Sequence, residues 1–110
     1  MLTEERIERL LGDLEAALAL LTDAADAVES AGELAAVAKA SALEEHEFTG
    51  KNAEAREREA LLTCVENATV QEKEFSLRMR KLELERAKAR AELTRCAIKL
   101  WIAAATEGRD

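Results

Sequence analysis

The sequence predicts an all-α fold: a long antiparallel helical hairpin, coiled-coil-like in its packing, that dimerises into a four-helix bundle. The chain contains no proline, and its charged residues are mostly Glu, Lys and Arg, which are good helix formers. Apolar residues recur at alternating spacings of three and four, the period of helices that pack lengthwise. One stretch near the middle holds turn-forming residues. Two helices joined by a short turn lie antiparallel, so we expect residues 1–110 to form a single helical domain.

The first helix is expected over about residues 3–47. Thr3 is a suitable N-cap, and Glu4 and Glu5 place negative charge in the first turn, where the helix dipole favours it. Around residues 30–33 a capping-box spacing encloses a glycine, which is compatible with a kink or a break. Because the apolar stripe continues through this segment, we favour a continuous or slightly bent helix. The stripe begins with Ile7, Leu10, Leu11, Leu14, Leu18, Leu21, Ala25 and Val28.

The turn is expected at residues 48–52, which include Gly50, Lys51 and Asn52. Gly50 is expected to adopt the left-handed backbone conformation that ends a helix. Asn52 is a good N-cap for the next helix, which opens with a run of Ala, Glu and Arg. The chain should therefore reverse its direction here.

The second helix is expected over about residues 52–107. Asn67, Thr69 and Glu72 have the spacing of a helix restart, but the apolar stripe favours a helix that continues through them. This stripe should pack against the first helix, and it includes Cys96 as a core residue. Its members are Leu61, Val65, Ala68, Phe75, Met79, Leu82, Ala89, Leu93, Cys96, Leu100 and Ala103.

The register of the hairpin follows from folding the chain at Gly50. Residue i should then lie opposite about residue 100 − i, so that Leu93 falls near Ile7. Since the second helix is longer, its last turns should lie opposite almost nothing, although they are strongly apolar. We expect a second copy to cover this overhang, with Trp101 as the anchor of an oligomer or partner interface. The interface residues are Ile98, Leu100, Trp101 and Ile102.

The charges are unevenly distributed along a chain of net charge −7. Residues 1–50 hold 12 acidic and 3 basic residues, whereas residues 78–99 hold 3 acidic and 8 basic ones. The hairpin would set the two regions side by side, which favours intramolecular pairing. The alternative is contact of the basic stretch with nucleic-acid phosphates, although it lacks interleaved aromatic residues for base stacking. The possible phosphate contacts are Arg78, Arg80, Lys81, Lys88, Arg95 and Lys99.

The two cysteines are expected to stay unpaired. Cys64 and Cys96 lie about 50 Å apart along one predicted helix, whereas a disulfide needs Cα atoms within about 7 Å. Free thiols suit a reducing compartment. The sequence shows no signal peptide, lipidation motif or run of 18 apolar residues, so we expect a cytoplasmic protein with no membrane partner.

The turn and the second helix carry a family resemblance. Thr49-Gly50-Lys51-Asn52-Ala53-Glu54-Ala55-Arg56, followed by Leu-Glu-Leu-Glu-Arg-Ala at residues 82–87, resembles a group of short all-helical proteins of tailed bacteriophages. Proteins of this group carry a Gly-Lys-Asn-Ala-Glu-x-Arg turn and are mostly of unknown function, and their genes often lie among early DNA-metabolism genes. The resemblance implies a location in the host cytoplasm and assigns no catalytic role to Gly50, Lys51, Asn52 or Arg56.

Catalytic and metal-binding patterns are sparse, and we expect no cofactor and no metal. Glu4-Glu5-x-x-Glu8 and Asp23-x-x-Asp26 are reminiscent of the Mg²⁺ motifs of all-helical nucleotide pyrophosphohydrolases, but they are expected over 20 Å apart on one helix. An acidic, solvated helix face is the favoured interpretation. His46, the single histidine, lacks a second imidazole or thiol ligand nearby and is expected on the surface.

The function expected from the sequence is that of a non-enzymatic, oligomeric helical interaction protein, a phage accessory that binds a host or phage protein. A nucleic-acid-binding accessory using residues 78–99 is the first alternative, and a Mg²⁺-dependent pyrophosphohydrolase is the second. A scaffold or assembly chaperone has no distinguishing sequence feature.

Overall fold

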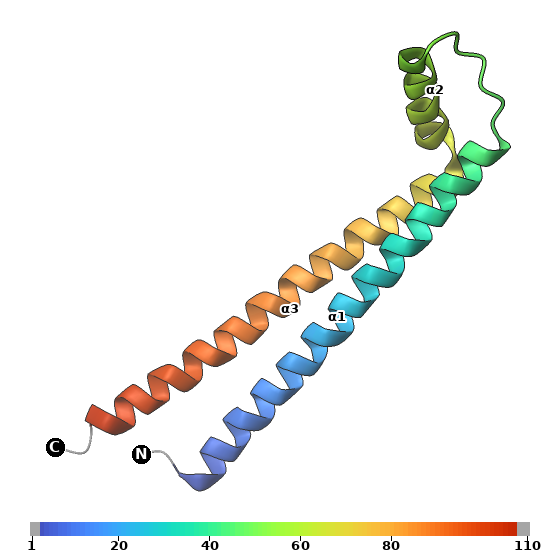
Figure 1. Ribbon diagram of the computed structural model, residues 1–110. Coiled ribbons are helices and arrows are strands. Elements are labelled where there is room, and N and C mark those ends of the chain that lie inside the picture. Colours follow the sequence, from blue (N-terminus) through green and yellow to red (C-terminus); the bar gives the residue numbers. More distant parts are fainter. Residues whose placement is uncertain (1–2, 108–110) are drawn as a thin grey trace. The chain divides into compact units, whose positions relative to one another are not determined.

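The computed structural model describes residues 3–107, which form three helices: α1 (Glu4–Glu45), α2 (Ala53–Glu66) and α3 (Ala68–Glu107) (Figure 1). No strand occurs between residues 3 and 107, so the all-α prediction is confirmed. The chain divides into two compact units. The first unit contains residues 4–26 of α1 and 82–107 of α3, and the second contains residues 27–81 with all of α2.

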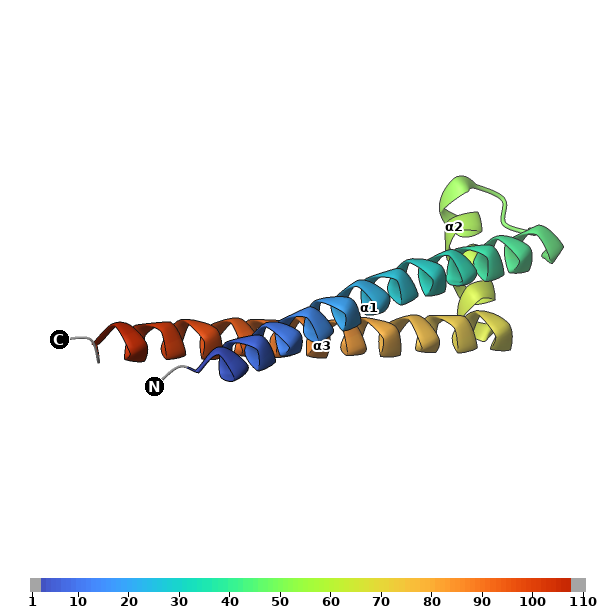
Figure 2. The ribbon, with the colours of Figure 1, turned by 90° about the horizontal axis from the view of Figure 1, so that it is seen from below.

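In the first unit, α1 and α3 lie side by side and run in opposite directions (Figures 1 and 2). The Arg6 guanidinium lies 4.0 Å from the centre of the Trp101 ring, which joins the start of α1 to the end of α3. Ala17 on α1 and Ala91 on α3 are buried. Half-buried leucine and isoleucine side chains extend this narrow core at Leu10, Leu14, Leu21, Leu84 and Ile98.

In the second unit, residues 27–45 of α1 lie antiparallel to residues 68–81 of α3. Lys39 forms an ion pair with Glu74, and a Cβ atom added to Gly32 would lie 4.0 Å from Leu77 Cδ1. The buried residues are small: Ala31, Ala35, Ala42 and Val70. Alanine and glycine at these positions leave room for the two helix backbones to approach closely.

The α1 residues that face α3 follow two interleaved rows, each with a period of seven. One row starts at Leu10 and the other at Leu14, and every member is buried or half-buried. This is the spacing of a coiled-coil seam. The side chains are mostly leucine and valine up to residue 28 and alanine from residue 31 onward: Leu10, Leu14, Ala17, Leu21, Ala24, Val28, Ala31, Ala35, Ala38 and Ala42.

The stripe of α3 that faces α1 differs from the one expected from the sequence. Most large residues of the expected stripe are exposed, including Phe75, Met79, Leu82, Leu93 and Leu100, and Cys96 is exposed as well. The prediction of Cys96 as a core residue is therefore wrong. A second stripe with the same period of seven is buried or half-buried instead, at Val70, Leu77, Leu84, Ala87, Ala91, Thr94, Ile98, Trp101 and Ala105.

The second predicted helix is interrupted at Asn67, so the prediction of one helix over residues 52–107 is wrong. Asn67 has an extended backbone (φ −79°, ψ 117°) between α2 and α3. Its N–H still donates to the Thr63 carbonyl oxygen at 3.1 Å, and its side-chain Oδ1 accepts from Val70 N at 3.0 Å. Asn67 thus ends α2 and caps α3, because a short amide side chain satisfies the free N–H groups of a new helix.

The predicted register is wrong for the same reason. Glu74, and not residue 61, lies opposite Lys39, and Trp101, and not residue 94, lies beside Arg6. The α2 segment is a separate helix, so the partner of α1 begins at Ala68. The start of α1 therefore reaches the end of α3, and the expected overhang is not observed.

The remaining helix boundaries agree closely with the sequence interpretation. Thr3 accepts from Arg6 N at 3.3 Å as an N-cap, α1 continues through residues 30–33, and Asn52 Oδ1 accepts from Ala55 N at 2.8 Å. Gly50 does not have the expected left-handed conformation. Glycine is needed there because a Cβ atom would lie 2.9 Å from Arg56 N.

Candidate interaction surfaces

An outward stripe of leucines on α3 is the main candidate site of the first unit. Leu82, Leu93 and Leu100 are 52%, 72% and 70% exposed. Leu93 lies two positions after buried Ala91, a rotation of about 200° around the helix, so the outward stripe is on the side of α3 away from α1. Exposed small residues, Ala89, Cys96 and Ala103, complete its period of seven. We call residues 82, 86, 89, 93, 96, 100 and 103 the outward stripe.

The four predicted interface residues are divided between two sides of α3. Ile98 and Trp101 are half-buried beside α1, whereas Leu100 and Ile102 are exposed. Leu100 belongs to the outward stripe. Of the four residues, Leu100 and Ile102 are therefore the two whose side chains are exposed to another molecule.

A shallow apolar groove lies where the end of α3 meets the start of α1. It has a volume of about 460 Å³, and Trp101 forms one wall beneath the Arg6 guanidinium. A cation over an indole face stabilises an exposed contact by about 0.5–1 kcal/mol. The groove residues are Ile7, Leu10, Leu11, Ile98, Trp101, Ile102, Ala105 and Thr106.

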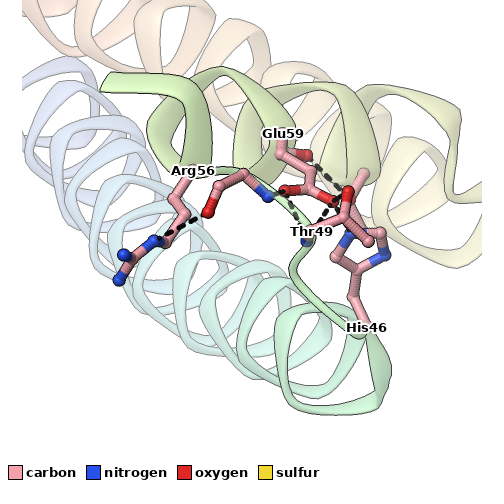
Figure 3. Close-up of polar contacts among 6 residues, drawn as sticks. His46, Thr49, Arg56 and Glu59 are labelled. Atoms are coloured by element: carbon pink, nitrogen blue, oxygen red, sulfur yellow. Dashed lines mark hydrogen bonds and ion pairs between the residues drawn. The ribbon is translucent and has the colours of Figure 1, made fainter. Parts of the chain in front are cut away.

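In the second unit, the carboxylate of Glu59 connects α2 to the segment that follows α1 (Figure 3). It accepts hydrogen bonds from Thr49 N at 3.0 and 3.1 Å, from Thr49 Oγ1 at 3.1 Å and from Gly50 N at 3.0 Å, and His46 Nε2 lies 3.0 Å from it. Arg56 Nε donates to the Gly50 carbonyl at 3.2 Å. The His46 ring also packs edge-on against Phe48, with centroids 4.9 Å apart. His46 is thus a structural residue of the turn.

These hydrogen bonds lower the pKa of Glu59 from 4.5 to about 2. The contact with His46 has the largest effect, and the Thr49 backbone N–H is next, because both stabilise the charged carboxylate. In the ion pair of the same unit, Lys39 lowers the pKa of Glu74, and Glu74 raises the pKa of Lys39.

The α2 helix has no buried residue. Its large apolar side chains, Leu61, Leu62 and Val65, are exposed by 59% or more. Leu61 and Val65 line a hollow of about 320 Å³ together with half-buried Cys64. A helix of 14 residues is marginal without tertiary packing, so its capping residues and Glu59 hold it in place.

Three basic residues of the stretch, Lys88, Arg95 and Lys99, form no ion pair with α1 among the described residues. Within the described residues, Lys88 pairs with Glu85 of its own helix at 3.4 Å, and Arg95 and Lys99 have no acidic partner. The ion pair between α1 and α3 has the reverse polarity, with lysine on α1 and glutamate on α3. Arg95 and Lys99 are exposed.

Metal binding finds no support in the described part of the chain. No group of three His, Cys, Asp or Glu side chains between residues 3 and 107 is arranged to hold a metal ion. The acidic clusters near Glu4 and Asp23 therefore do not converge within one chain. No helix in this part of the chain has the length and apolar content required to cross a membrane.

Comparison with protein-family models, curated proteins and solved structures finds no match to this chain. The interpretation of the surfaces therefore rests on their geometry. Sequence reasoning missed the role of Glu59, because its partners lie 9 to 13 residues away and no local spacing marks such a contact.

Proposed function

We propose that this chain is a non-enzymatic helical interaction protein that associates with itself and binds another protein. The outward stripe supports the proposal most strongly. Leucines at regular helical spacing on an exposed face are unfavourable in water and are the form that helix-to-helix docking takes. Two copies joined in this way bring four long helices together, as in the four-helix assembly expected from the sequence.

The second partner is a protein of the host or of a phage, met in the host cytoplasm. The resemblance of residues 49–56 to short phage proteins favours such an accessory role. Apolar side chains outside the outward stripe remain for that contact: Leu61, Leu62 and Val65 on α2 are exposed and close together in sequence.

Self-association is tested by melting the protein at several concentrations. If two copies bind in the folded state, the melting temperature rises with concentration, since association stabilises the folded form. We expect this rise in the wild type and its loss in a Leu93→Asn, Leu100→Asn variant. Leu20→Asn is the matched control, because Leu20 is 48% exposed on α1 of the same unit. A melting temperature of the wild type that is independent of concentration would overturn self-association.

Nucleic-acid binding is the second candidate, favoured by the exposed and unpaired Arg95 and Lys99 of the described chain. It predicts binding to double-stranded DNA that weakens steeply between 50 and 200 mM salt, by about a factor of ten or more if several phosphates are contacted. An Arg95→Gln, Lys99→Gln variant should bind more weakly and show a smaller salt dependence. No detectable binding at low salt would remove this candidate.

A further inference from the structure

We propose that α2 is a latched arm: when the contact between Glu59 and His46 is released, α2 swings about Asn67 and joins α3 as one helix. The structure contains the closed form, in which α2 leaves the axis of α3 at Asn67 (Figures 1 and 2). The residues involved all lie in the second unit. The proposal adds a conformational change to the interaction function above and does not depend on any partner.

The break at Asn67 is confined to one backbone angle. Its φ of −79° is within the helical range, whereas its ψ of 117° differs from the helical value of about −42°. The helical hydrogen bonds on both sides are already present: Asn67 N donates to the Thr63 carbonyl at 3.1 Å, and Gln71 N donates to the Asn67 carbonyl at 3.0 Å. Rotation of this single angle therefore brings α2 into line with α3.

Hydrogen bonding at the break differs little between the two forms. One continuous helix would have backbone hydrogen bonds from the N–H groups of residues 68–70 to the carbonyls of residues 64–66. In the closed form two side chains bind there instead: Asn67 Oδ1 accepts from Val70 N at 3.0 Å, and Gln71 Nε2 donates to the Val65 carbonyl at 2.7 Å. The other contacts of α2 therefore decide which form is the more stable.

The packing of α2 contributes little to the closed form. Its apolar residues Leu61 and Val65 are more than 60% exposed, and they line the hollow of about 320 Å³ with Lys39 of α1 and Glu74 of α3. Burial of large apolar side chains, the main source of stability, is thus small for this helix. The half-buried side chains of α2 are all small or polar: Ala55, Glu59, Ala60, Thr63 and Cys64.

The exposed apolar residues have the spacing of the open form. Leu61 and Val65 continue an exposed row of α3 with no change of phase across Asn67. Steps of four and three residues alternate through the break, as they do within one helix, whereas two separate helices need not share a phase. The members of the row in the second unit are Leu61, Val65, Ala68, Glu72, Phe75 and Met79.

The contact between Glu59 and His46 exists only in the closed form. The ion pair of Lys39 with Glu74 sets the end of α1 beside the start of α3. His46 directly follows α1, so it lies at that level. In the open form, Glu59 would lie nine residues before Ala68, about 13 Å farther along the helix axis. The 3.0 Å contact must then break, and we call this contact the latch.

The segment between α1 and α2 is long enough for the open form. Residue 53 would lie 15 residues beyond residue 68, about 22 Å along the axis. The eight steps from residue 45 to residue 53 span about 26 Å when the chain is extended. The turn must open for this, which requires the hydrogen bonds of Thr49 and Gly50 to Glu59 to break as well. The paired parts of α1 and α3 need not move.

The distance between spin labels on α2 and α3 tests the proposal. Labels are attached to Arg58→Cys and Lys81→Cys, two exposed positions, in a Cys64→Ser, Cys96→Ser parent. Dilution with unlabelled protein limits the pulsed electron paramagnetic resonance signal to distances within one chain. In one continuous helix, 23 residues separate the two Cα atoms by about 35 Å. In the closed form the distance is shorter, because α2 leaves the axis of α3 between the labels.

We expect Glu59→Ala to add a second distance near 35 Å to the shorter distance of the parent. Glu57→Ala is the matched control, because Glu57 is an exposed glutamate of the same helix, and it should keep the single shorter distance. Adding Asn67→Ala to Glu59→Ala removes the cap of α3 and should raise the ratio of the long to the short distance roughly fivefold.

A Glu59→Ala protein without the distance near 35 Å would overturn the proposal. Circular dichroism of the same samples measures helix content, which should not fall. A fall in helix content in place of the longer distance would also overturn the proposal, because α2 would then unfold and not join α3. A parent whose main distance is already near 35 Å would show that the Glu59–His46 contact does not hold α2 closed.

Discussion

A single carboxylate, that of Glu59, holds the segment after α1 in its conformation. It receives two backbone N–H groups and the Thr49 hydroxyl, and it contacts His46. Hydrogen bonds to a charged acceptor are stronger than those to a neutral one. A residue on an exposed helix therefore determines the path of a loop about ten residues earlier in the chain.

Glu59→Gln should loosen that loop without unfolding the helices. The amide keeps the size of the side chain, but it loses the charge and one of the two acceptor oxygens. We expect the Thr49 and Gly50 amides to exchange with deuterium roughly ten times faster, as measured by NMR. Glu57→Gln is the control, because Glu57 is an exposed neighbour on the same helix. Unchanged exchange at Thr49 and Gly50 would contradict the role of Glu59.

The lowered pKa of Glu59 makes the same contact sensitive to acid. A carboxyl group with a pKa of about 2 in the folded state and 4.5 as the ordinary value stabilises the fold at pH values above 4.5. This stabilisation decreases as the pH falls from about 4.5 toward 2, where Glu59 binds a proton. An NMR titration of the side-chain carboxyl carbons should show the midpoint of Glu59 well below its ordinary value of 4.5. A midpoint of Glu59 near 4.5 would exclude the carboxylate contact.

Two glycines should respond to alanine in opposite directions. Gly12 is within α1, and a Cβ atom there meets nothing within 4 Å, so Gly12→Ala should stabilise the protein by about 0.5–1 kcal/mol. At Gly50, a Cβ atom would lie 2.9 Å from Arg56 N, so Gly50→Ala should destabilise it by about 1–3 kcal/mol. Urea unfolding followed by circular dichroism measures both changes. Equal effects of the two substitutions would contradict the packing at Gly50.

At the scale of the helices, the alanines of α1 that face α3 should not tolerate replacement by a larger residue. Ala35 is 3% exposed against α3, and the adjacent Ala36 is exposed. Ala35→Leu should destabilise the fold by about 1–3 kcal/mol, because the added atoms force the helices apart. Ala36→Leu keeps the same helix propensity and should change stability by less than about 0.5 kcal/mol. Urea unfolding of the two variants compares them directly, and equal stabilities would show that α1 and α3 do not pack closely at Ala35.

Helix content was predictable from the sequence, but the choice of packing face was not. The rows of α3 that contain Ala91 and Leu93 have the same period of seven, and the exposed row holds the larger apolar residues. The periodicity shows that α3 has two such rows, but it does not show which of them packs against α1. The feature that decides between the rows is the N-cap at Asn67. It separates α2 from α3 and thereby sets the register of α3 against α1.

For the whole molecule, the proposed self-association depends on a face of α3 that α1 does not cover. The predicted overhang is not observed, because Arg6 of α1 lies beside Trp101 of α3. The exposed residue Leu100 instead lies on the side of α3 that faces away from α1. Which side of α3 remains free depends on the register between α1 and α3. The contacts of Lys39 and Trp101 determine that register.

The most direct test of the central claim is the mass of the wild-type protein in solution, measured by light scattering over a range of concentrations. With self-association, the mass should rise from 12.1 kDa toward twice that value as the concentration increases, and the Leu93→Asn, Leu100→Asn variant should remain at the lower value. A wild type that stays at 12.1 kDa at every concentration would contradict the claim that a second copy covers the outward stripe.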